Sequence, residues 1–169
     1  AWGLGGAMWQ GVGDEEGTRA LREAFDSGVD FIDSALVYGE GHSESLVRDV
    51  LRDRKGSRVV VATKIPPKNF VWPGEAATPL SETFPATWVE KCVETSLRNL
   101  GTEALDLEQF HVWQDAWLDS PDWDKTRSTM ERLKRDGKVL HWGVSINDHA
   151  PETALRLASD PLIESAQVI

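Results

Sequence analysis

Short apolar segments and amphipathic segments alternate along the sequence at intervals of roughly thirty residues, the spacing of βαβ units. Residues 58–65, RVVVATKI, are rich in the β-branched side chains that parallel sheets bury. Residues 86–100 instead repeat apolar side chains with helical spacing and end at Gly101. The alternation predicts parallel strands joined by right-handed helical crossovers. Strands are expected at the end of 1–9 and at 29–33, 58–65, 105–113, 139–147 and 165–169, and helices at 14–26, 43–55, 86–100, 122–137 and 151–159.

Two architectures satisfy this alternation, the doubly wound sheet and the TIM barrel. Polar residues follow successive strands, which suits a barrel because the carboxyl ends of its strands converge. No GxGxxG turn follows the first strand, which counts against a Rossmann sheet. We therefore expect an α/β fold, the (β/α)8 TIM barrel, with about six of the eight units present in a single partial domain over residues 1–169. Such an open barrel has two unpaired edges, so we expect it to fold poorly and to show little activity alone.

The composition excludes several classes of partner. A formal net charge of −10 repels nucleic acid and anionic membranes. Neither a signal peptide nor an apolar run of membrane length is visible in these residues. Cys92 is the only cysteine, so an internal disulfide is impossible and a reduced, cytoplasmic setting is expected. A small molecule remains as the expected partner, and the sequence carries no signal for oligomeric state.

Four residues at the ends of predicted strands form a candidate catalytic set: Asp33, Tyr38, Lys64 and His111. A tyrosine has an ordinary pKa of about 10, and a nearby lysine ammonium is expected to lower that pKa. A carboxylate beside the lysine would hold it charged and in place. A neutral histidine can polarise a carbonyl oxygen through a hydrogen bond, and the phenol can then deliver a proton to that oxygen. No strong nucleophile is present, so a hydride from a nicotinamide would have to attack the carbon.

Each of these residues also has a structural interpretation. Asp33 can cap a loop, Tyr38 can pack, Lys64 can be a solvated charge and His111 a hydrogen-bonded core residue. Ser145 and Asn147 are common turn formers, and only the joint arrangement favours catalysis. A metal-dependent hydrolase is a further alternative, with ligands Asp33, His42, Glu44 and His111. No HxH or HExxH spacing supports that alternative, and Lys64 would repel a cation.

Residues 66–85 form a long segment rich in proline, threonine and serine that carries Phe70 and Trp72. A segment of this length without regular structure is usually functional in a compact domain. Eight tryptophans are present, several of them in predicted loops, where aromatic rings often line binding sites. These features favour an apolar or aromatic carbonyl substrate, or a sugar stacked on an indole ring.

Several of these segments resemble the aldo-keto reductase superfamily. The similarity lies in FIDSALVYGEGHSE at 31–44, the strand ending in Lys64, SLRNLGTEALDLEQFHVW at 96–113 and WGVSIN at 142–147, in the family's order and over essentially the whole chain. The resemblance implies a (β/α)8 barrel that reduces aldehydes or ketones with NAD(P)H. It further implies that Tyr38 is the general acid, that Lys64 and Asp33 tune it, and that His111 orients the carbonyl.

The resemblance also implies a cofactor site. Ser145, Asn147 and Gln167 would hold the nicotinamide carboxamide, although Ile146 separates a serine and an asparagine that are adjacent in the family. Trp2 or Trp9 would wall the site, Asp33 would also border the cofactor, and Trp9, Trp72 and Trp113 would contact substrate. We expect NADPH rather than NADH, and no metal. The alternative function is a nucleotide-binding regulatory subunit on the same scaffold with little catalysis.

Overall fold

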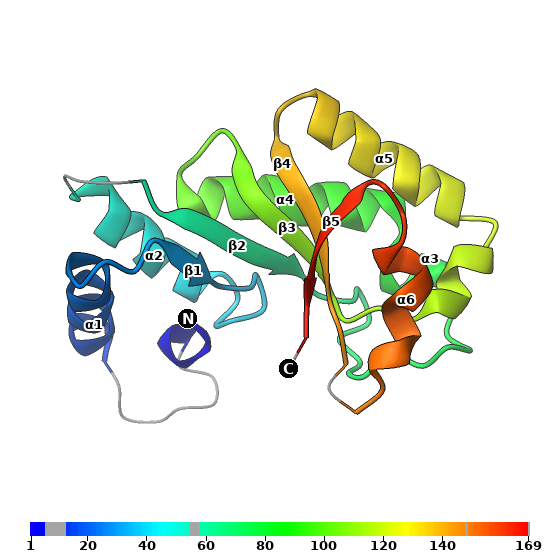
Figure 1. Cartoon of the computed structure of the whole chain (residues 1–169), viewed down its shortest axis with the longest axis horizontal. Helices are drawn as coiled ribbons and strands as arrows, with labels where there is room; N and C mark the ends of the chain where they lie inside the picture. Colours follow the sequence, from blue (N-terminus) through cyan, green and yellow to red (C-terminus); the bar gives the residue numbers. More distant parts are fainter. Residues whose placement is uncertain (6–12, 55–57, 148, 169) are drawn as a thin grey trace.

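A curled, parallel five-stranded sheet forms the centre of the molecule (Figure 1). The computed structural model describes residues 1–5, 13–54, 58–147 and 149–168, with the backbone alone at Trp2 and Gly5. The strands are β1 (Phe31–Asp33), β2 (Val60–Ile65), β3 (Leu105–His111), β4 (Val139–Ser145) and β5 (Ile163–Gln167). They lie side by side in sequence order, and each neighbouring pair is parallel. This is the topology of part of a (β/α)8 barrel.

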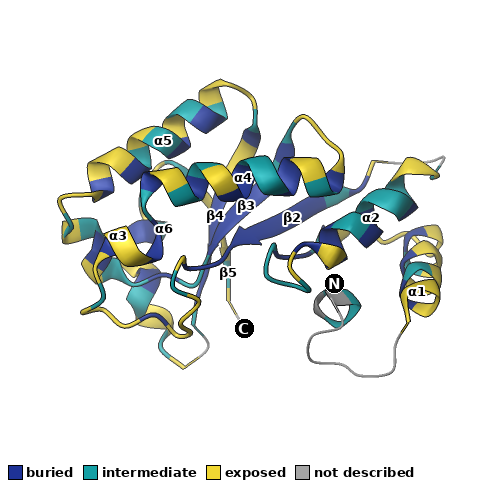
Figure 2. Cartoon of the chain, turned by 180° about the vertical axis from the view of Figure 1, so that it is seen from behind, coloured by how far each residue is buried: buried dark blue, intermediate teal, exposed yellow. Residues whose placement is uncertain are grey.

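Helices follow the strands and cover the outer side of the sheet. They are α1 (Asp14–Asp26), α2 (His42–Arg52), α3 (Leu80–Thr83), α4 (Ala86–Leu100), α5 (Trp123–Arg135) and α6 (Leu155–Ala158), with the 3-10 helices η1 (Trp2–Gly5), η2 (Asp115–Asp119) and η3 (Pro151–Ala154). Figure 2 shows α4 lying over the buried central strands, with its exposed residues turned away from them. Among the described residues, no helix is both long and apolar enough to cross a membrane.

Local sequence explains where the main elements begin and end. The buried residues of α4 recur at helical spacing and form one face toward the sheet. Gly101 ends the helix with a left-handed φ of 63°. Asp14, Glu15 and Glu16 place negative charge at the positive N-terminus of α1. In β2 all but the first residue are buried, as its β-branched composition predicts.

Four expectations differ from the structure. Residues 2–5 form η1 rather than the end of a strand, because the backbone N–H of Leu4 donates to the carbonyl of Ala1 at 3.0 Å and no strand of the described chain pairs with them. The described residues therefore hold five strands rather than six. The long segment 66–85 includes α3, and the helix expected at 151–159 is divided into η3 and α6.

An aromatic cluster fills the space between the sheet and the helices near α3 and α5. It consists of Phe84, Phe110, Trp113, Trp117, Trp123 and Trp142, each buried. The rings of Phe84 and Phe110 meet edge to face with centroids 5.1 Å apart, a favoured aromatic geometry. This packing anchors the carboxyl end of β3, where one of the candidate catalytic residues lies.

Candidate active site

Three of the four predicted catalytic residues lie at the carboxyl ends of consecutive strands. Asp33 is the last residue of β1, Lys64 the penultimate residue of β2 and His111 the last residue of β3. Because parallel strands end at one edge of a sheet, these side chains are carried to the same place. Tyr38 joins them from the turn between β1 and α2.

The ammonium group of Lys64 lies at the centre of the cluster. Its side chain is 2% exposed, and Nζ donates to Oδ1 of Asp33 at 2.6 Å and to the carbonyl of Ser34 at 2.8 Å. Burial lowers the pKa of Lys64, while the hydrogen bond and charge of Asp33 oppose that shift. Asp33 therefore favours the charged form of the buried lysine and fixes its position.

A turn of three left-handed residues positions Tyr38. Gly39, Glu40 and Gly41 have φ angles of 64°, 54° and 91°, a conformation that glycine adopts at little cost. The backbone N–H of Ser43 then donates to the carbonyl of Tyr38 at 3.2 Å. A Cβ added at Gly41 would collide with the side-chain amide of Asn99 on α4. The glycine is therefore required for both its φ angle and its close approach to α4.

The phenol of Tyr38 is less acidic than the sequence predicts. Nζ of Lys64 lies 5.4 Å from the centroid of the tyrosine ring, the proximity on which the expected lowering of the pKa depends. Burial and the charge of Asp33 instead raise the pKa of Tyr38 to about 12. The expected direction is wrong because burial disfavours the charged phenolate, and the charge of Asp33 adds to that effect. Tyr38 consequently keeps its proton at neutral pH.

The surroundings of His111 favour the neutral form of its imidazole. Burial and the nearby Lys64 lower the pKa of His111 to about 4. Its ring meets the ring of Tyr38 at 90°, with centroids 6.2 Å apart. Nδ1 is buried and has no hydrogen-bond partner among the described residues. A neutral ring with unused hydrogen-bonding capacity thus lies next to a protonated phenol.

Trp72 lies beside this cluster. Its indole Nε1 donates to the carbonyl of His111 at 2.8 Å, and the two rings have centroids 6.0 Å apart. The residue is 38% exposed, so part of the indole is accessible to a ligand. Trp9, the second predicted substrate residue, lies outside the described residues.

Trp113 lies in the core and not in the site. It is 0% exposed, and its ring packs against Phe84, Phe110 and Trp117 with centroids 5.8, 4.8 and 5.2 Å away. The chain beyond His111 carries this indole into the aromatic cluster under α3 and α5. We therefore correct the prediction that Trp113 contacts substrate, because core side chains already cover its ring.

A group of amides lies on the next strands. Ser145, at the end of β4, pairs in register with Gln167 of β5. Nε2 of Gln109 donates to Oε1 of Gln167 at 3.4 Å, whereas Oε1 of Gln109 is buried without a partner among the described residues. Sequence reasoning missed Gln109, although its position two residues before His111 places both on one face of the strand. An unpaired amide oxygen fits a ligand that brings an N–H donor, as a carboxamide does.

Asn147 and Trp2 are the remaining residues that were predicted to contact the cofactor. Oδ1 of Asn147 accepts a hydrogen bond from the backbone N–H of His149 at 3.0 Å, so this oxygen is engaged in its own loop. Ile146, between Ser145 and Asn147, is 6% exposed and belongs to the core. At Trp2 only the backbone is described, so its contact with the cofactor stays a prediction.

Two of the four residues of the metal-site alternative, His42 and Glu44, are engaged with other side chains. Nε2 of His42 pairs with Asp14 at 2.8 Å, and Glu44 is buried where it accepts hydrogen bonds from Thr63 at 2.6 Å and from Asn99 at 2.8 Å. Within the described parts of the chain, no group of three histidine, cysteine, aspartate or glutamate side chains could hold a metal ion. The hydrolase alternative gains no support from this arrangement.

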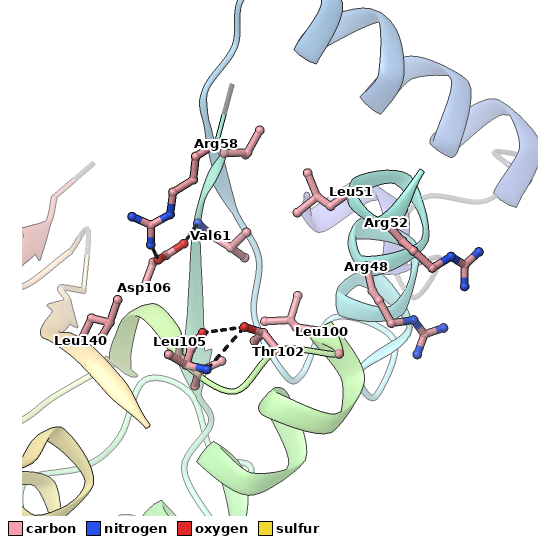
Figure 3. A pocket seen from close by; sticks show the side chains of 13 residues that line it. Arg48, Leu51, Arg52, Arg58, Val61, Leu100, Thr102, Leu105, Asp106 and Leu140 are labelled. Atoms are coloured by element: carbon pink, nitrogen blue, oxygen red, sulfur yellow. Dashed lines mark hydrogen bonds and ion pairs between the residues drawn. The ribbon is translucent and has the colours of Figure 1, made fainter. Parts of the chain in front are cut away.

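Two hollows lie toward opposite ends of the strands. One of 230 Å³ lies on the inner face of the sheet beside the cluster, lined by Phe31, Asp33, Leu107, Gln109, Ser165 and Gln167. The other, of 480 Å³, lies at the amino ends of β2 and β3 (Figure 3). Figure 3 shows the head groups of Arg48 and Arg52 directed away from it and Arg58 paired with Asp106. The larger hollow holds none of the predicted catalytic groups, so the smaller one borders the candidate active site.

Comparison with protein families gives a match over residues 1–164, to the model of the Aldo/keto reductase family. Among curated proteins, the chain is 33% identical over 145 residues to the aldo-keto reductase YhdN of Bacillus subtilis (strain 168). That alignment covers 85% of this chain and 41% of the relative. The chain therefore spans less than half the length of this relative.

The chain is also similar to solved structures of aldo-keto reductases. The glycerol dehydrogenase AKR11B4 from Gluconobacter oxydans is 32% identical, with a TM-score of 0.70, over 99% of this chain and 49% of that one. An aldo-keto reductase from Klebsiella pneumoniae in complex with NADPH is 30% identical, with a TM-score of 0.69, over 99% and 51%. These likenesses confirm the predicted fold class, with this chain corresponding to part of a (β/α)8 barrel.

Proposed function

The chain belongs to the aldo/keto reductase family, and from that premise we propose that it reduces aldehyde or ketone carbonyls to alcohols. The single observation that carries the proposal is the buried Lys64–Asp33 ion pair, 2.6 Å long, beside the protonated phenol of Tyr38 and the neutral imidazole of His111. The raised pKa of Tyr38 and the lowered pKa of His111 favour the protonated phenol and the neutral imidazole that carbonyl reduction needs.

His111 binds and polarises the substrate in this proposal. A neutral imidazole carries one N–H, which can donate to the carbonyl oxygen and leave the carbonyl carbon more electrophilic. The pKa of about 4 keeps the ring in that form throughout the physiological range. Its proximity to Tyr38 directs the same oxygen toward the phenol.

Tyr38 supplies the proton. As the carbonyl oxygen gains negative charge it becomes basic enough to take the phenolic proton, even though the pKa of Tyr38 is about 12. The ammonium group of Lys64 then stabilises the phenolate that is left, and Asp33 keeps that ammonium charged and oriented. The high pKa therefore suits a donor that must stay protonated until the oxygen becomes basic.

The amides near Ser145 fit a nicotinamide carboxamide. Ser145 and Gln167 supply hydrogen-bonding groups, Asn147 lies two residues after Ser145, and the unpaired Oε1 of Gln109 can accept the carboxamide N–H. When bound, the nicotinamide supplies the hydride that adds to the carbonyl carbon. We propose NADPH as the preferred form, supported by the NADPH complex of the similar Klebsiella pneumoniae structure.

The direct test is Tyr38→Phe, assayed with NADPH and a panel of aldehydes. The variant should lose most turnover, at least about 100-fold, because it lacks only the proton donor. Cofactor affinity, followed by quenching of tryptophan fluorescence with NADPH and then NADH, should change little. Unchanged turnover would contradict the assignment. Cofactor binding without turnover in the wild-type protein would instead favour the regulatory alternative.

A further inference from the structure

A continuous series of aromatic rings leads outward from the candidate catalytic cluster. The ring of His111 lies 6.0 Å from Trp72, the ring of Trp72 lies 6.1 Å from Phe70, and the ring of Phe70 lies 6.1 Å from Trp88. We call Trp72, Phe70 and Trp88 the aromatic stripe. It joins the segment after β2 to the first turns of α4, and it begins in contact with a predicted catalytic residue.

Hydrogen bonds fix the two indoles of the aromatic stripe. Nε1 of Trp72 donates to the carbonyl of His111 and Nε1 of Trp88 to the carbonyl of Pro66, each at 2.8 Å. Rings anchored by their polar ends present their apolar faces at low conformational cost. The stripe is therefore ordered before any ligand arrives.

Phe70, between the indoles, is the most exposed member of the aromatic stripe. It is 56% exposed and has a φ of 54°, a backbone conformation uncommon for residues other than glycine. Its N–H donates to the carbonyl of Pro67 at 3.0 Å, and the next N–H, of Val71, donates to Oδ1 of Asn69 at 3.1 Å. These bonds hold a large apolar side chain in water, where nothing in the core uses it.

We propose that the aromatic stripe binds the distal part of the substrate and selects carbonyl compounds that carry an extended aromatic body. This inference rests on the proposed function, because the stripe is continuous with His111, where the carbonyl oxygen would be held. A substrate of two linked rings would cover Trp72 and Phe70, while one short aliphatic chain would reach neither. At the outer end, the ammonium group of Lys91 lies 5.4 Å from the ring centroid of Trp88, so the apolar surface ends in a cation.

The test compares biphenyl-4-carbaldehyde with propanal in the wild-type protein and in Phe70→Ala. The ratio of kcat/KM for the two aldehydes should fall about tenfold in the variant, since a lost aromatic contact acts on the longer substrate alone. Phe70→Tyr should restore the ratio. Val71→Ala is the matched control, because Val71 is exposed in the same loop but carries no aromatic ring, and its ratio should equal that of the wild type.

A second measurement separates failure of this inference from failure of the proposed function. Calorimetry should detect binding of biphenyl-4-carbaldehyde that Phe70→Ala weakens by a similar factor. If no aldehyde is turned over but this difference appears, the proposed function fails and the aromatic stripe stands as a ligand site. An unchanged ratio and unchanged binding in folded Phe70→Ala would overturn the stripe. A change in oligomeric state alone would also overturn it, and would assign the rings to contact between copies.

Discussion

Among single residues, Gly41 constrains the position of Tyr38 most strictly. Its φ of 91° disfavours any side chain, and a Cβ there would displace the amide of Asn99. That amide donates to Oε2 of buried Glu44 at 2.8 Å, so a displaced Asn99 would leave a buried carboxylate oxygen unpaired. The position of Tyr38, the proposed proton donor, thus depends on a hydrogen bond in a different layer of the fold.

We predict that Gly41→Ala lowers the free energy of unfolding by about 2–4 kcal/mol, since strain in φ adds to the loss of the hydrogen bond. Urea unfolding would measure the loss. Gly28→Ala is the matched control, because Gly28 has a φ of 98° but open space around its Cβ position. Strain alone should cost about 1 kcal/mol there. Equal losses at the two glycines would show that contact with Asn99 contributes nothing.

The sequence predicts residue positions better than residue environments. Asp33, Lys64 and His111 could be placed together because the strand pattern fixes where each strand ends. The direction of the pKa shift of Tyr38 could not be predicted, because it depends on the burial of the phenol and on the nearby charge of Asp33. The burial of Trp113 could not be predicted either, because nothing in the local sequence indicates how the chain turns after a strand.

Two carboxyl groups are buried among α2, α4, β2 and β3, and they differ in their hydrogen bonding. Glu44, on α2, accepts hydrogen bonds from Thr63 and Asn99. Glu108, on β3, is 0% exposed, and neither of its oxygens has a well-formed hydrogen bond within the described residues. Burial, and secondarily the charge of Glu44, raises the pKa of Glu108 well above its usual range. Burial therefore favours the protonated form of Glu108 in the layer that supports Lys64.

We predict that this carboxyl makes stability fall as the pH rises. The folded state holds the proton of Glu108 more tightly than the unfolded state, so its stabilisation is complete below the unfolded pKa of about 4.3. That stabilisation is lost as the pH rises from there through the raised folded value. Glu108→Gln, which cannot ionise, should be more stable than the wild type at pH 8 by about 1–3 kcal/mol and nearly equal at pH 4.5.

Urea unfolding at both pH values checks this prediction. Glu103→Gln is the control, because Glu103 is exposed and its replacement should leave the difference between pH 4.5 and pH 8 as in the wild type. A parallel pH dependence in wild type and Glu108→Gln would contradict the protonated state of Glu108.

Long elements were predictable and short ones were not. The range 86–100 was expected and found as α4 because fifteen residues of helical spacing end at a left-handed glycine. Residues 2–5 and α3 escaped prediction because four residues carry too little periodicity to distinguish a helical turn from a strand end or a loop. The division of 151–159 into η3 and α6 has the same cause.

At the scale of the whole molecule, the sheet ends in two edges. In the described residues β1 pairs only with β2, and β5 pairs only with β4. Apolar side chains accompany both edges: Phe31 in β1 is 48% exposed, and Val168 after β5 is 61% exposed. Unpaired backbone groups beside exposed apolar side chains form a template for pairing with another chain.

We predict that residues 1–169, produced on their own, associate as their concentration rises, and that Phe31→Lys or Val168→Lys weakens this association about tenfold. A lysine at a strand edge opposes pairing by its charge and removes apolar area that association would bury. Light scattering over a concentration series would measure the apparent mass. Leu155→Lys is the matched control, because Leu155 is 62% exposed but lies in the helix α6, which presents no unpaired strand backbone. If the control weakens association as much as the edge variants, general surface charge rather than strand pairing governs it; a constant monomer mass would contradict the prediction outright.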